Sequence, residues 1–196
     1  MNKRLIILAK RPVLGFVKTR LAKQVGPEMA LRIYERMLNK VLGLASQGPS
    51  VVYWTGQGDT PLVECSKEQS EGDLGQRMLQ AVESELGSSA MVVVIGTDCP
   101  ELRGDHISLV FSLLQNHDVV IGPAHDGGYY LIGMKVAERG LFDDMPWSTS
   151  NVFSITLERC RLLRLAVATL PVMHDLDEWT DIENQADRQW LLHDLK

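Results

Sequence analysis

Four groups of polar residues in this chain have the residue types that bind phosphates or divalent cations. The first lies in the segment KRPVLGFVKTR, which places Lys10, Lys18 and Arg20 around the flexible Gly15. Fixed positive charge, exposed backbone amides and an arginine that contacts two oxygens at once are suited to binding a phosphate group. The alternative is a solvated basic loop without a ligand. We predict a phosphate-binding loop, because the segment follows an apolar run typical of a buried strand.

The second group, GTDCP at 96–100, comes directly after the apolar run Met91–Ile95. A carboxylate at the tip of a buried strand is held rigidly and has one open face. This arrangement suits a ligand for Mg²⁺ or Mn²⁺, which prefer oxygen donors and bridge to phosphates. The alternative is an aspartate that caps the turn before Pro100. We predict that Asp98 binds the metal and serves catalysis, and that Cys99 is a packing residue.

The third group, GPAHDGGYY at 122–130, combines an acidic residue with two adjacent glycines. Gly127 and Gly128 let the backbone approach a ligand closely. Asp126 has the chemistry of a general base or of an acceptor for a sugar hydroxyl. Tyr129 has an aromatic ring that either stacks on a base or sugar or packs in the core. The alternative for the whole group is an ordinary Asp-Gly turn.

The fourth group, HDLDE at 174–178, contains two carboxylates two residues apart. In an extended segment Asp175 and Asp177 point the same way, so they are able to share one cation. The alternative is N-capping of a helix that starts at Trp179. We predict Asp177 as the second metal ligand, with Asp175 as the alternative. Arg77, which follows the GDLG motif at 72–75, is a further candidate for nucleotide binding.

Alternating strands and helices are expected to position these groups. The expected strands are Leu5–Ala9, Val51–Thr55, a short one near 62–65, Met91–Ile95, Val119–Ile121, Tyr129–Met134 and 165–171. One helix is expected to open at Gly26–Pro27, one to run from Asp73 to about Leu86, and others to cover 105–116, 148–163 and 179–192, whereas 10–24 is expected to be a loop. The alternation predicts an α/β fold with a mostly parallel sheet covered by helices on both faces.

The polar groups fall where such a sheet binds ligands, which is the crevice beyond the carboxyl ends of its strands. Segment 10–20 follows the first predicted strand, 96–98 the fourth and 122–128 the fifth. Groups far apart in the sequence are therefore expected to meet at one edge, and the pattern predicts an enzyme-like site there.

Composition and charge exclude several function classes. The chain has 196 residues, which predicts one domain over 1–196, and its net charge of −5 argues against a dedicated nucleic-acid binder. Residues 1–23 carry a net charge of +7 and the other 173 residues −12. The early apolar run Leu5–Ala9 is too short for a signal peptide or a membrane span. Three cysteines without metal-ligand spacing favour the cytoplasm.

In this order, the motifs resemble a bacterial family of uncharacterised glycosyltransferase-A-like proteins that are described as associated with radical-SAM proteins. The matching pieces are AK at 9–10 with Pro12 and Gly15, VKTRL at 17–21, GDLG at 72–75 with Arg77 and Met78, GTDCP at 96–100, GP at 122–123 with DGGYYLIG at 126–133, PWST at 146–149, and DLD at 175–177 with Asp181. The resemblance spans nearly the whole chain. It implies the nucleotide-diphospho-sugar transferase fold, a Rossmann-like three-layer α/β/α sandwich with a mostly parallel mixed sheet. It also implies that the first loop meets the nucleotide and phosphates.

Two enzymatic functions and one binding function follow from these expectations. The first is a metal-dependent glycosyltransferase, in which Mg²⁺ or Mn²⁺ stabilises the departing nucleoside diphosphate, Lys18 and Arg20 hold phosphates, and Asp126 orients the sugar or activates the acceptor. The second is a guanylyltransferase-like nucleotidyltransferase, which attacks an α-phosphate and releases pyrophosphate. The third is a nucleotide-sugar-binding protein without turnover. All three take a nucleotide or nucleotide sugar as the small-molecule partner.

Overall fold

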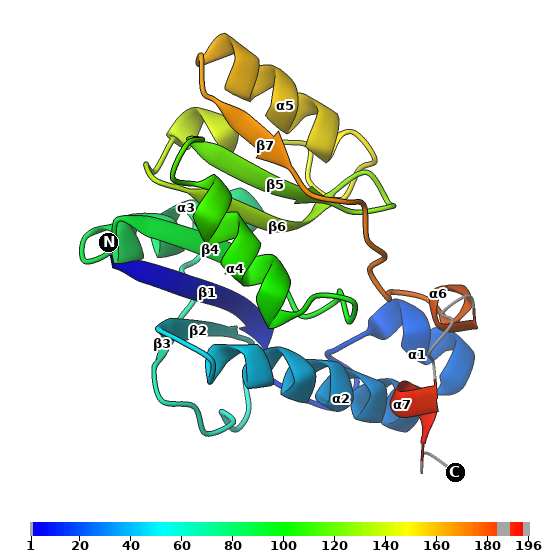
Figure 1. Ribbon diagram of the computed structural model, residues 1–196. Coiled ribbons are helices and arrows are strands. Elements are labelled where there is room, and N and C mark those ends of the chain that lie inside the picture. The colour runs from blue at the N-terminus through cyan, green and yellow to red at the C-terminus, as the bar shows by residue number, and fades with distance from the viewer. Residues whose placement is uncertain (1, 184–188, 194–196) are drawn as a thin grey trace.

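The computed structural model describes residues 2–183 and 189–193, which form a seven-stranded sheet of order β3-β2-β1-β4-β6-β5-β7 with helices on both faces (Figure 1). The strands are β1 (Lys3–Lys10), β2 (Ser50–Thr55), β3 (Ser66–Glu68), β4 (Met91–Ile95), β5 (Val119–Pro123), β6 (Tyr129–Met134) and β7 (Val167–Thr169). Their order requires crossovers, because β4 lies beside β1 and β7 beside β5.

The sheet is mixed but mostly parallel. Strands β3, β2, β1 and β4 run parallel, as do β5 and β7, and only β6 runs antiparallel to its neighbours β4 and β5. The predicted α/β fold with a mostly parallel mixed sheet is therefore confirmed. A tight turn, residues 124–128, joins β5 to the antiparallel β6, and so lies at the carboxyl end of β5.

The helices are α1 (Thr19–Val25), α2 (Pro27–Ala45), α3 (Leu74–Leu86), α4 (Gly104–Leu113), α5 (Val152–Leu162), α6 (Trp179–Glu183) and α7 (Gln189–Leu192), with a short 3₁₀ helix η1 (Arg139–Leu141). One hydrophobic core joins the sheet to α2 and α4, and a second joins it to α3 and α5. Figure 1 shows α2 and α4 in front of the sheet and α3 behind it. Both faces are covered, which explains why every residue of β4 is buried.

A third hydrophobic cluster lies outside the two layers that flank the sheet. Leu21 of α1, Ile33 of α2, Ile182 of α6 and Leu191 of α7 are all buried there, together with Leu176. Such burial contributes about 1.5–3 kcal/mol for each large aliphatic side chain. This cluster therefore anchors the C-terminal segment to the two helices that follow the first strand.

Several element predictions differ from the structure, and the helix expected over 148–163 begins only at Val152. Segment 10–24 is not all loop, because Thr19–Val25 forms α1. This helix has a single buried residue, Leu21, so its sequence lacks the apolar periodicity that would have predicted it. The strand expected near 62–65 lies at Ser66–Glu68 instead, where all three residues are exposed and hydrophobic patterning is absent. The expected helix 179–192 is described as α6 and α7, and residues 184–188 lie outside the described part of the chain.

No helix within 2–183 or 189–193 combines the length and the apolar character needed to cross a bilayer.

Candidate active site

Three of the side chains predicted for the site meet directly. Lys18 Nζ lies 2.7 Å from Asp98 Oδ1 and 3.0 Å from Asp177 Oδ1, and it donates a third hydrogen bond of 2.5 Å to the carbonyl oxygen of Leu176. We call Lys18, Asp98 and Asp177 the Lys18 cluster. The lysine side chain is only 4% exposed, whereas the two carboxylates are 42% and 47% exposed. The cluster therefore presents carboxylate oxygens to solvent with the ammonium beneath them.

Asp98 is positioned by the buried central strand β4. The strand ends at Ile95, and the following Thr97 is buried and donates a hydrogen bond of 3.2 Å from its hydroxyl to Asp98 Oδ1. The carbonyl of Asp98 accepts a hydrogen bond of 2.9 Å from the amide of Leu176. The rigid strand and this crosslink hold the carboxylate at the edge of the sheet.

Lys18 is positioned by a constrained backbone. It has φ 46° and ψ 46°, the left-handed region, and it precedes the first residue of α1. Such a conformation is unfavourable for a residue with a Cβ and persists only where the surroundings impose it. Here Val17 and Leu21 are both buried on either side of it. Their packing turns the Lys18 side chain inward, toward the carboxyl end of β4.

Asp177 is held by the segment that leads into α6. Leu176 is buried in the third hydrophobic cluster, which fixes the residue next to Asp177. Asp181 Oδ2 accepts hydrogen bonds from the amides of Asp177 and Glu178, at 2.9 and 2.7 Å. Capping at the start of α6 is thus performed by Asp181, and the carboxylate of Asp177 is directed to Lys18. Sequence reasoning did not assign this role to Asp181.

Asp175 lies close to the same cluster but has a different environment. Burial, followed by the negative charges of Asp98 and Asp126, raises the pKa of Asp175 to about 7, and Lys18 only partly offsets this. A carboxyl group with this pKa is able to accept or release a proton near neutral pH. The sequence left Asp175 and Asp177 as alternatives for the second metal ligand. Of these two, Asp177 is the one that contacts Lys18.

The turn between β5 and β6 brings Asp126 to this edge. Asp126 is exposed, and its Oδ1 accepts a hydrogen bond of 2.8 Å from the amide of Gly128. Gly127 has φ +88°, and a Cβ there would lie 2.1 Å from the carbonyl oxygen of Ser150. The amide of Phe153 donates to the Gly127 carbonyl at 2.8 Å. Gly127 is thus needed for close packing of the turn against the segment that leads into α5, whereas a Cβ at Gly128 would meet only the Asp126 side chain.

Arg77 lies on the β1–β2 side of the edge. Its Nη1 donates to Gln69 Oε1 at 3.3 Å, and Gln69 Nε2 donates to the carbonyls of Ala9 and Tyr53 at 3.2 and 2.9 Å. Gln69 thereby links Arg77 to the carboxyl ends of two strands, a role without any sequence signal. Nothing brings Arg77 into contact with the Lys18 cluster.

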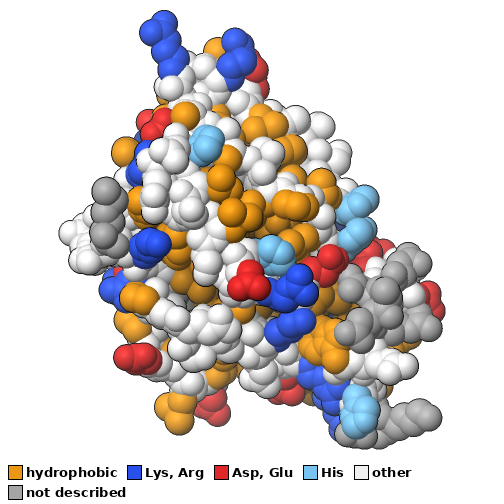
Figure 2. Space-filling model, in the orientation of Figure 1, with side chains coloured by type: hydrophobic (Ala, Val, Ile, Leu, Met, Phe, Trp, Pro, Cys, Tyr) orange, Lys and Arg blue, Asp and Glu red, His pale blue; other side chains and the backbone are white. Residues whose placement is uncertain are grey.

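The other predicted phosphate ligands lie along the first loop. Lys10 is exposed at the end of β1, where Tyr34 Oη bridges its amide and carbonyl at 3.0 and 2.7 Å. Gly15 is exposed with φ +80°, and Arg20 is exposed on α1. In the space-filling view, basic, acidic and histidine side chains stand close together between the sheet and the side where Figure 1 places α1 and α6 (Figure 2).

Tyr129 is committed largely to packing. Its ring meets Trp147 edge-on, with centroids 6.2 Å apart, and burial strongly raises the pKa of its hydroxyl. Its backbone, rather than its ring, is near the glycine turn. Cys99 is buried, and burial raises the pKa of its thiol to about 12, which agrees with a packing residue rather than a nucleophile.

Two histidines join the glycine turn to the C-terminal segment. The rings of His125 and His174 stack with centroids 3.9 Å apart and an interplanar angle of 15°. His174 Nδ1 also lies 3.4 Å from Glu101 Oε1. The segments themselves are joined by backbone hydrogen bonds, from the amide of His125 to the carbonyl of Met173 at 3.0 Å and from the amide of Met173 to the carbonyl of Pro123 at 3.1 Å. Since His125 precedes Asp126 and His174 precedes Asp175, these bonds bring the two acids to the same edge.

The residues of the Lys18 cluster fit a Mg²⁺ or Mn²⁺ ion. Asp98 and Asp177 supply two carboxylate oxygens that already converge on one positive charge, and both are open to solvent. Within the described residues, no group of three or more His, Cys, Asp or Glu side chains is arranged to hold a metal alone. Mg²⁺ is commonly bound by one or two carboxylates together with water and substrate phosphates. The donor set suits a metal that arrives with a phosphate ligand.

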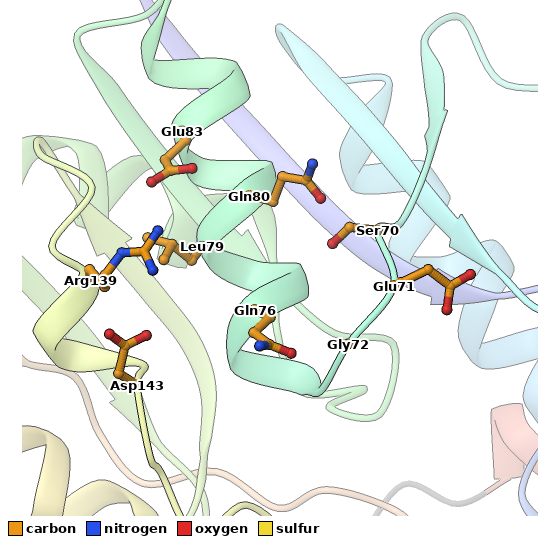
Figure 3. Close-up of a pocket in the computed structure, with 9 residues that line it drawn as sticks. All are labelled: Ser70, Glu71, Gly72, Gln76, Leu79, Gln80, Glu83, Arg139 and Asp143. Carbon is orange, nitrogen blue, oxygen red and sulfur yellow. The ribbon is translucent and has the colours of Figure 1, made fainter.

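A surface cavity lies elsewhere, along α3. It has a volume of about 530 Å³ and is lined by Ser70, Glu71, Gly72, Gln76, Leu79, Gln80, Glu83, Arg139 and Asp143. Figure 3 shows these side chains spread along both flanks of α3, without a common point toward which they converge. Only Leu79 offers an apolar side chain, and the cavity contains no residue from the carboxyl ends of the central strands. We therefore place the candidate active site at the Lys18 cluster.

Solved structures of other proteins have the same fold. A candidate nucleotide-diphospho-sugar transferase from Desulfovibrio desulfuricans G20 has a TM-score of 0.86 and 28% identity, and the match covers 96% of this chain and 91% of that one. Rv0371c from Mycobacterium tuberculosis H37Rv, in complex with manganese, has a TM-score of 0.53 and 13% identity over 93% and 97% of the two chains. CMP:2-keto-3-deoxy-manno-octonic acid synthetase, complexed with CTP, has a TM-score of 0.52 and 13% identity over 93% and 96%.

The last two similarities show the fold alone. Together with the first they confirm the nucleotide-diphospho-sugar transferase fold, which is shared by sugar transferases and nucleotidyltransferases. A search of curated protein sequences gives no match. A family model described as "Uncharacterized protein conserved in bacteria (DUF2064)" matches residues 35–149, which is more than half of the chain. The chain therefore belongs to this bacterial family, DUF2064.

Proposed function

We propose that the protein is a glycosyltransferase that uses a nucleotide-diphospho-sugar donor and depends on Mg²⁺ or Mn²⁺. The observation that carries the proposal is the Lys18 cluster, in which two carboxylates from distant segments converge at the carboxyl edge of a nucleotide-diphospho-sugar transferase fold. The 28% identity to the Desulfovibrio protein, over nearly the full length of both chains, supports a sugar-nucleotide donor.

The motifs along the chain support the finer placement. Their order agrees with the glycosyltransferase-A-like group associated with radical-SAM proteins, and we propose that residues 1–196 form a single domain of this kind. Three free cysteines, two of them buried, support the proposal that the protein works in the cytoplasm.

In the proposed reaction, Asp98 and Asp177 would hold the metal, which neutralises the diphosphate when it is bound. Lys18 and Arg20 hold the phosphates, with Lys10 and Gly15 on the same loop, and stabilise the charge that develops on the leaving nucleoside diphosphate. The glycine turn at Gly127 and Gly128, with Tyr129 after it, would place its backbone beside the sugar.

Asp126 lies across the edge from this loop, on the turn between β5 and β6. It would orient the sugar or take the proton of the acceptor hydroxyl, since its carboxylate is exposed and is fixed by the amide of Gly128. Arg77 would contact the nucleotide from the β1–β2 side, where Gln69 holds it.

A nucleotidyltransferase is the second candidate. It is favoured by the position of Lys18 on the first loop beside Asp98, since the same lysine and metal would assist attack on an α-phosphate. The fold is also that of a synthetase complexed with CTP. A nucleotide-sugar-binding protein without turnover ranks third, because several acids are held at the strand ends in a manner suited to catalysis.

Product analysis with Mg²⁺ or Mn²⁺ separates the candidates. The protein is incubated with a panel of nucleotide sugars and acceptors, and in parallel with nucleoside triphosphates, with EDTA in the control arms. Release of a nucleoside diphosphate from a nucleotide sugar supports the glycosyltransferase. Release of pyrophosphate from a nucleoside triphosphate contradicts the glycosyltransferase and supports the nucleotidyltransferase. Binding without either product, measured as a rise in melting temperature across the same panel, supports the binding protein.

A further inference from the structure

Lys18 has no hydrogen-bonding capacity left for a phosphate in this structure. An ammonium group has three N–H donors. The three acceptors of Lys18 Nζ are Leu176 O at 2.5 Å, Asp98 Oδ1 at 2.7 Å and Asp177 Oδ1 at 3.0 Å. The side chain is 4% exposed, so it is also shielded from an incoming ligand. The residue expected to bind phosphates is instead bound to the two carboxylates expected to bind the metal.

We propose that Lys18 is a built-in cation that occupies the metal position until a phosphate ligand draws it away, so that metal and nucleotide bind cooperatively. This inference rests on the proposed function for the identity of the site. It adds a second role for Lys18 and an order to the assembly of the active complex.

The charges of the cluster explain why the two cations exclude each other. With the ammonium in place, the two carboxylates and Lys18 sum to a net charge of −1. A divalent ion placed on the same oxygens would meet a positive charge at contact distance, and like charges repel at this separation, the more so because the ammonium side chain is only 4% exposed. Without the ammonium, two carboxylates face each other uncompensated and require a cation. Metal binding and the Lys18 contacts are therefore alternatives.

A phosphate ligand supplies the force that exchanges one cation for the other. Lys18 directly precedes α1, at the end of the loop that leads from β1 to the exposed Arg20, where the phosphates are expected. Its flexible four-carbon stem allows the ammonium to leave the carboxylates by side-chain rotation, with the backbone retained. Negative charge on the loop favours this rotation, which frees Asp98 and Asp177 for the metal. By linkage, the metal in turn strengthens phosphate binding by the same factor.

The direct test measures Mn²⁺ binding without any nucleotide. Wild-type protein, Lys18→Met and Lys23→Met are titrated with Mn²⁺, and free Mn²⁺ is followed by its electron paramagnetic resonance signal. Methionine is unbranched and only one atom shorter than lysine, and it removes the charge. Lys23 is exposed on the same helix and serves as the matched control. We expect Lys18→Met to bind Mn²⁺ about tenfold more tightly than wild type or more, within the usual range of coupling between two ligands. Lys23→Met should match wild type.

A stability measurement keeps the test valid if Lys18→Met folds poorly. In EDTA this variant should melt below wild type, because two carboxylates have lost their cation. Added Mn²⁺ should raise its melting temperature, whereas Mn²⁺ alone should leave wild type and Lys23→Met nearly unchanged. In wild type, Mn²⁺ with inorganic pyrophosphate should raise the melting temperature by more than the two separate shifts combined. In Lys18→Met this excess should be lost.

Two results overturn the inference, and they differ in what they mean for the proposed function. If wild type binds Mn²⁺ alone as tightly as Lys18→Met, the lysine does not compete with the metal, while the metal site and the proposed function stand. If no variant binds Mn²⁺, with or without pyrophosphate, the metal site itself is wrong, and the proposed function fails together with the inference.

Discussion

The amide of Leu176 donates a hydrogen bond of 2.9 Å to the carbonyl of Asp98. This bond joins the residues after the central strand β4 to a segment almost eighty residues later in the chain. Asp98 itself carries one carboxylate of the Lys18 cluster, and Leu176 directly precedes the other, Asp177. Because Leu176 is also buried among the residues of α1, α2 and α6, the position of Asp177 follows from the packing of the C-terminal segment. The geometry of the Lys18 cluster is therefore a property of the whole carboxyl edge rather than of one motif.

Removal of the Asp98 charge should abolish metal-dependent activity while the fold is kept. Asp98→Asn retains the shape of the side chain and the backbone bond to Leu176, but it removes one of the two anionic oxygens expected to bind the metal. We expect kcat/KM to fall by about 100-fold or more, equivalent to about 3 kcal/mol of transition-state stabilisation. The measurement is product release at saturating Mn²⁺, with a Mn²⁺ titration for each protein.

The matched control for this substitution is Glu35→Gln, which removes an exposed charge from α2. It should leave both kcat/KM and the Mn²⁺ dependence unchanged. Full activity in Asp98→Asn, with the Mn²⁺ dependence of wild type, would contradict the metal assignment.

The sequence allowed the sheet and the strand ends to be predicted, because both depend on local pattern. Met91–Ile95 is a continuous apolar run, and a buried strand is the consequence. When strands alternate with helices in a parallel sheet, the residues that follow the strands lie at one edge of the sheet. Lys18, Asp98 and Asp126 were therefore identifiable as a group. The positive N-terminal segment and the acidic remainder of the chain also meet at this edge, in the Lys18 cluster.

The contacts within the site were not predictable, because they depend on tertiary packing. Lys18 and Asp177 are separated by 159 residues, and no periodicity indicates that they touch. The inward turn of Lys18 arises from a left-handed backbone conformation at a position without glycine. Likewise, Thr169 and its neighbours were expected to form a longer strand than β7, because propensity cannot show where pairing with β5 ends.

Substitution at Gly127 should destabilise the fold and disturb the Asp126 turn. Gly127→Ala forces a Cβ onto a backbone with φ +88° and to within 2.1 Å of the Ser150 carbonyl, so the turn must move away from α5. We expect a loss of at least about 2 kcal/mol in the free energy of unfolding, measured by urea denaturation. Gly43→Ala is the control, since it lies in α2 with nothing within 4 Å of the new Cβ. It should stabilise the protein by about 0.5–1 kcal/mol, and equal effects at the two sites would refute the argument.

Glu85 should be the most sensitive structural acid among the described residues, because it is 3% exposed and links three strands to α3. Its Oε1 accepts hydrogen bonds from Tyr53 Oη at 2.9 Å and Lys67 Nζ at 2.7 Å, and its Oε2 lies 3.2 Å from Arg4 Nε. Glu85→Ala leaves a cavity and removes the partner of all three groups. We expect a loss of about 2–3 kcal/mol, reduced because Arg4 and Lys67 regain water. Glu83→Ala, at an exposed position on the same helix, should change stability by about 0.5 kcal/mol at most.

Asp175 should make the protein less stable as the pH rises from about 4 to about 7. Its folded-state pKa of about 7 is above the value of an unfolded aspartate, about 3.9, so the folded state binds more protons in this window. Stability falls with pH wherever the folded state binds more protons than the unfolded state. The deficit is complete above the folded pKa and amounts to about 4 kcal/mol, since each pKa unit corresponds to about 1.4 kcal/mol. Asp175→Asn, measured in EDTA, should remove this slope and be more stable than wild type at pH 8.

Asp118 supplies a control of opposite sign for the same measurement. Its pKa is lowered, first by a hydrogen bond from the amide of Ala166 and then by Lys135, so its contribution to stability is present above the unfolded pKa and is lost as the pH falls below it. Asp118→Asn should therefore be less stable than wild type at pH 8, whereas Asp175→Asn is more stable. If the two variants shift stability at pH 8 in the same direction, the half-buried carboxyl of Asp175 is not the group that carries the pH dependence.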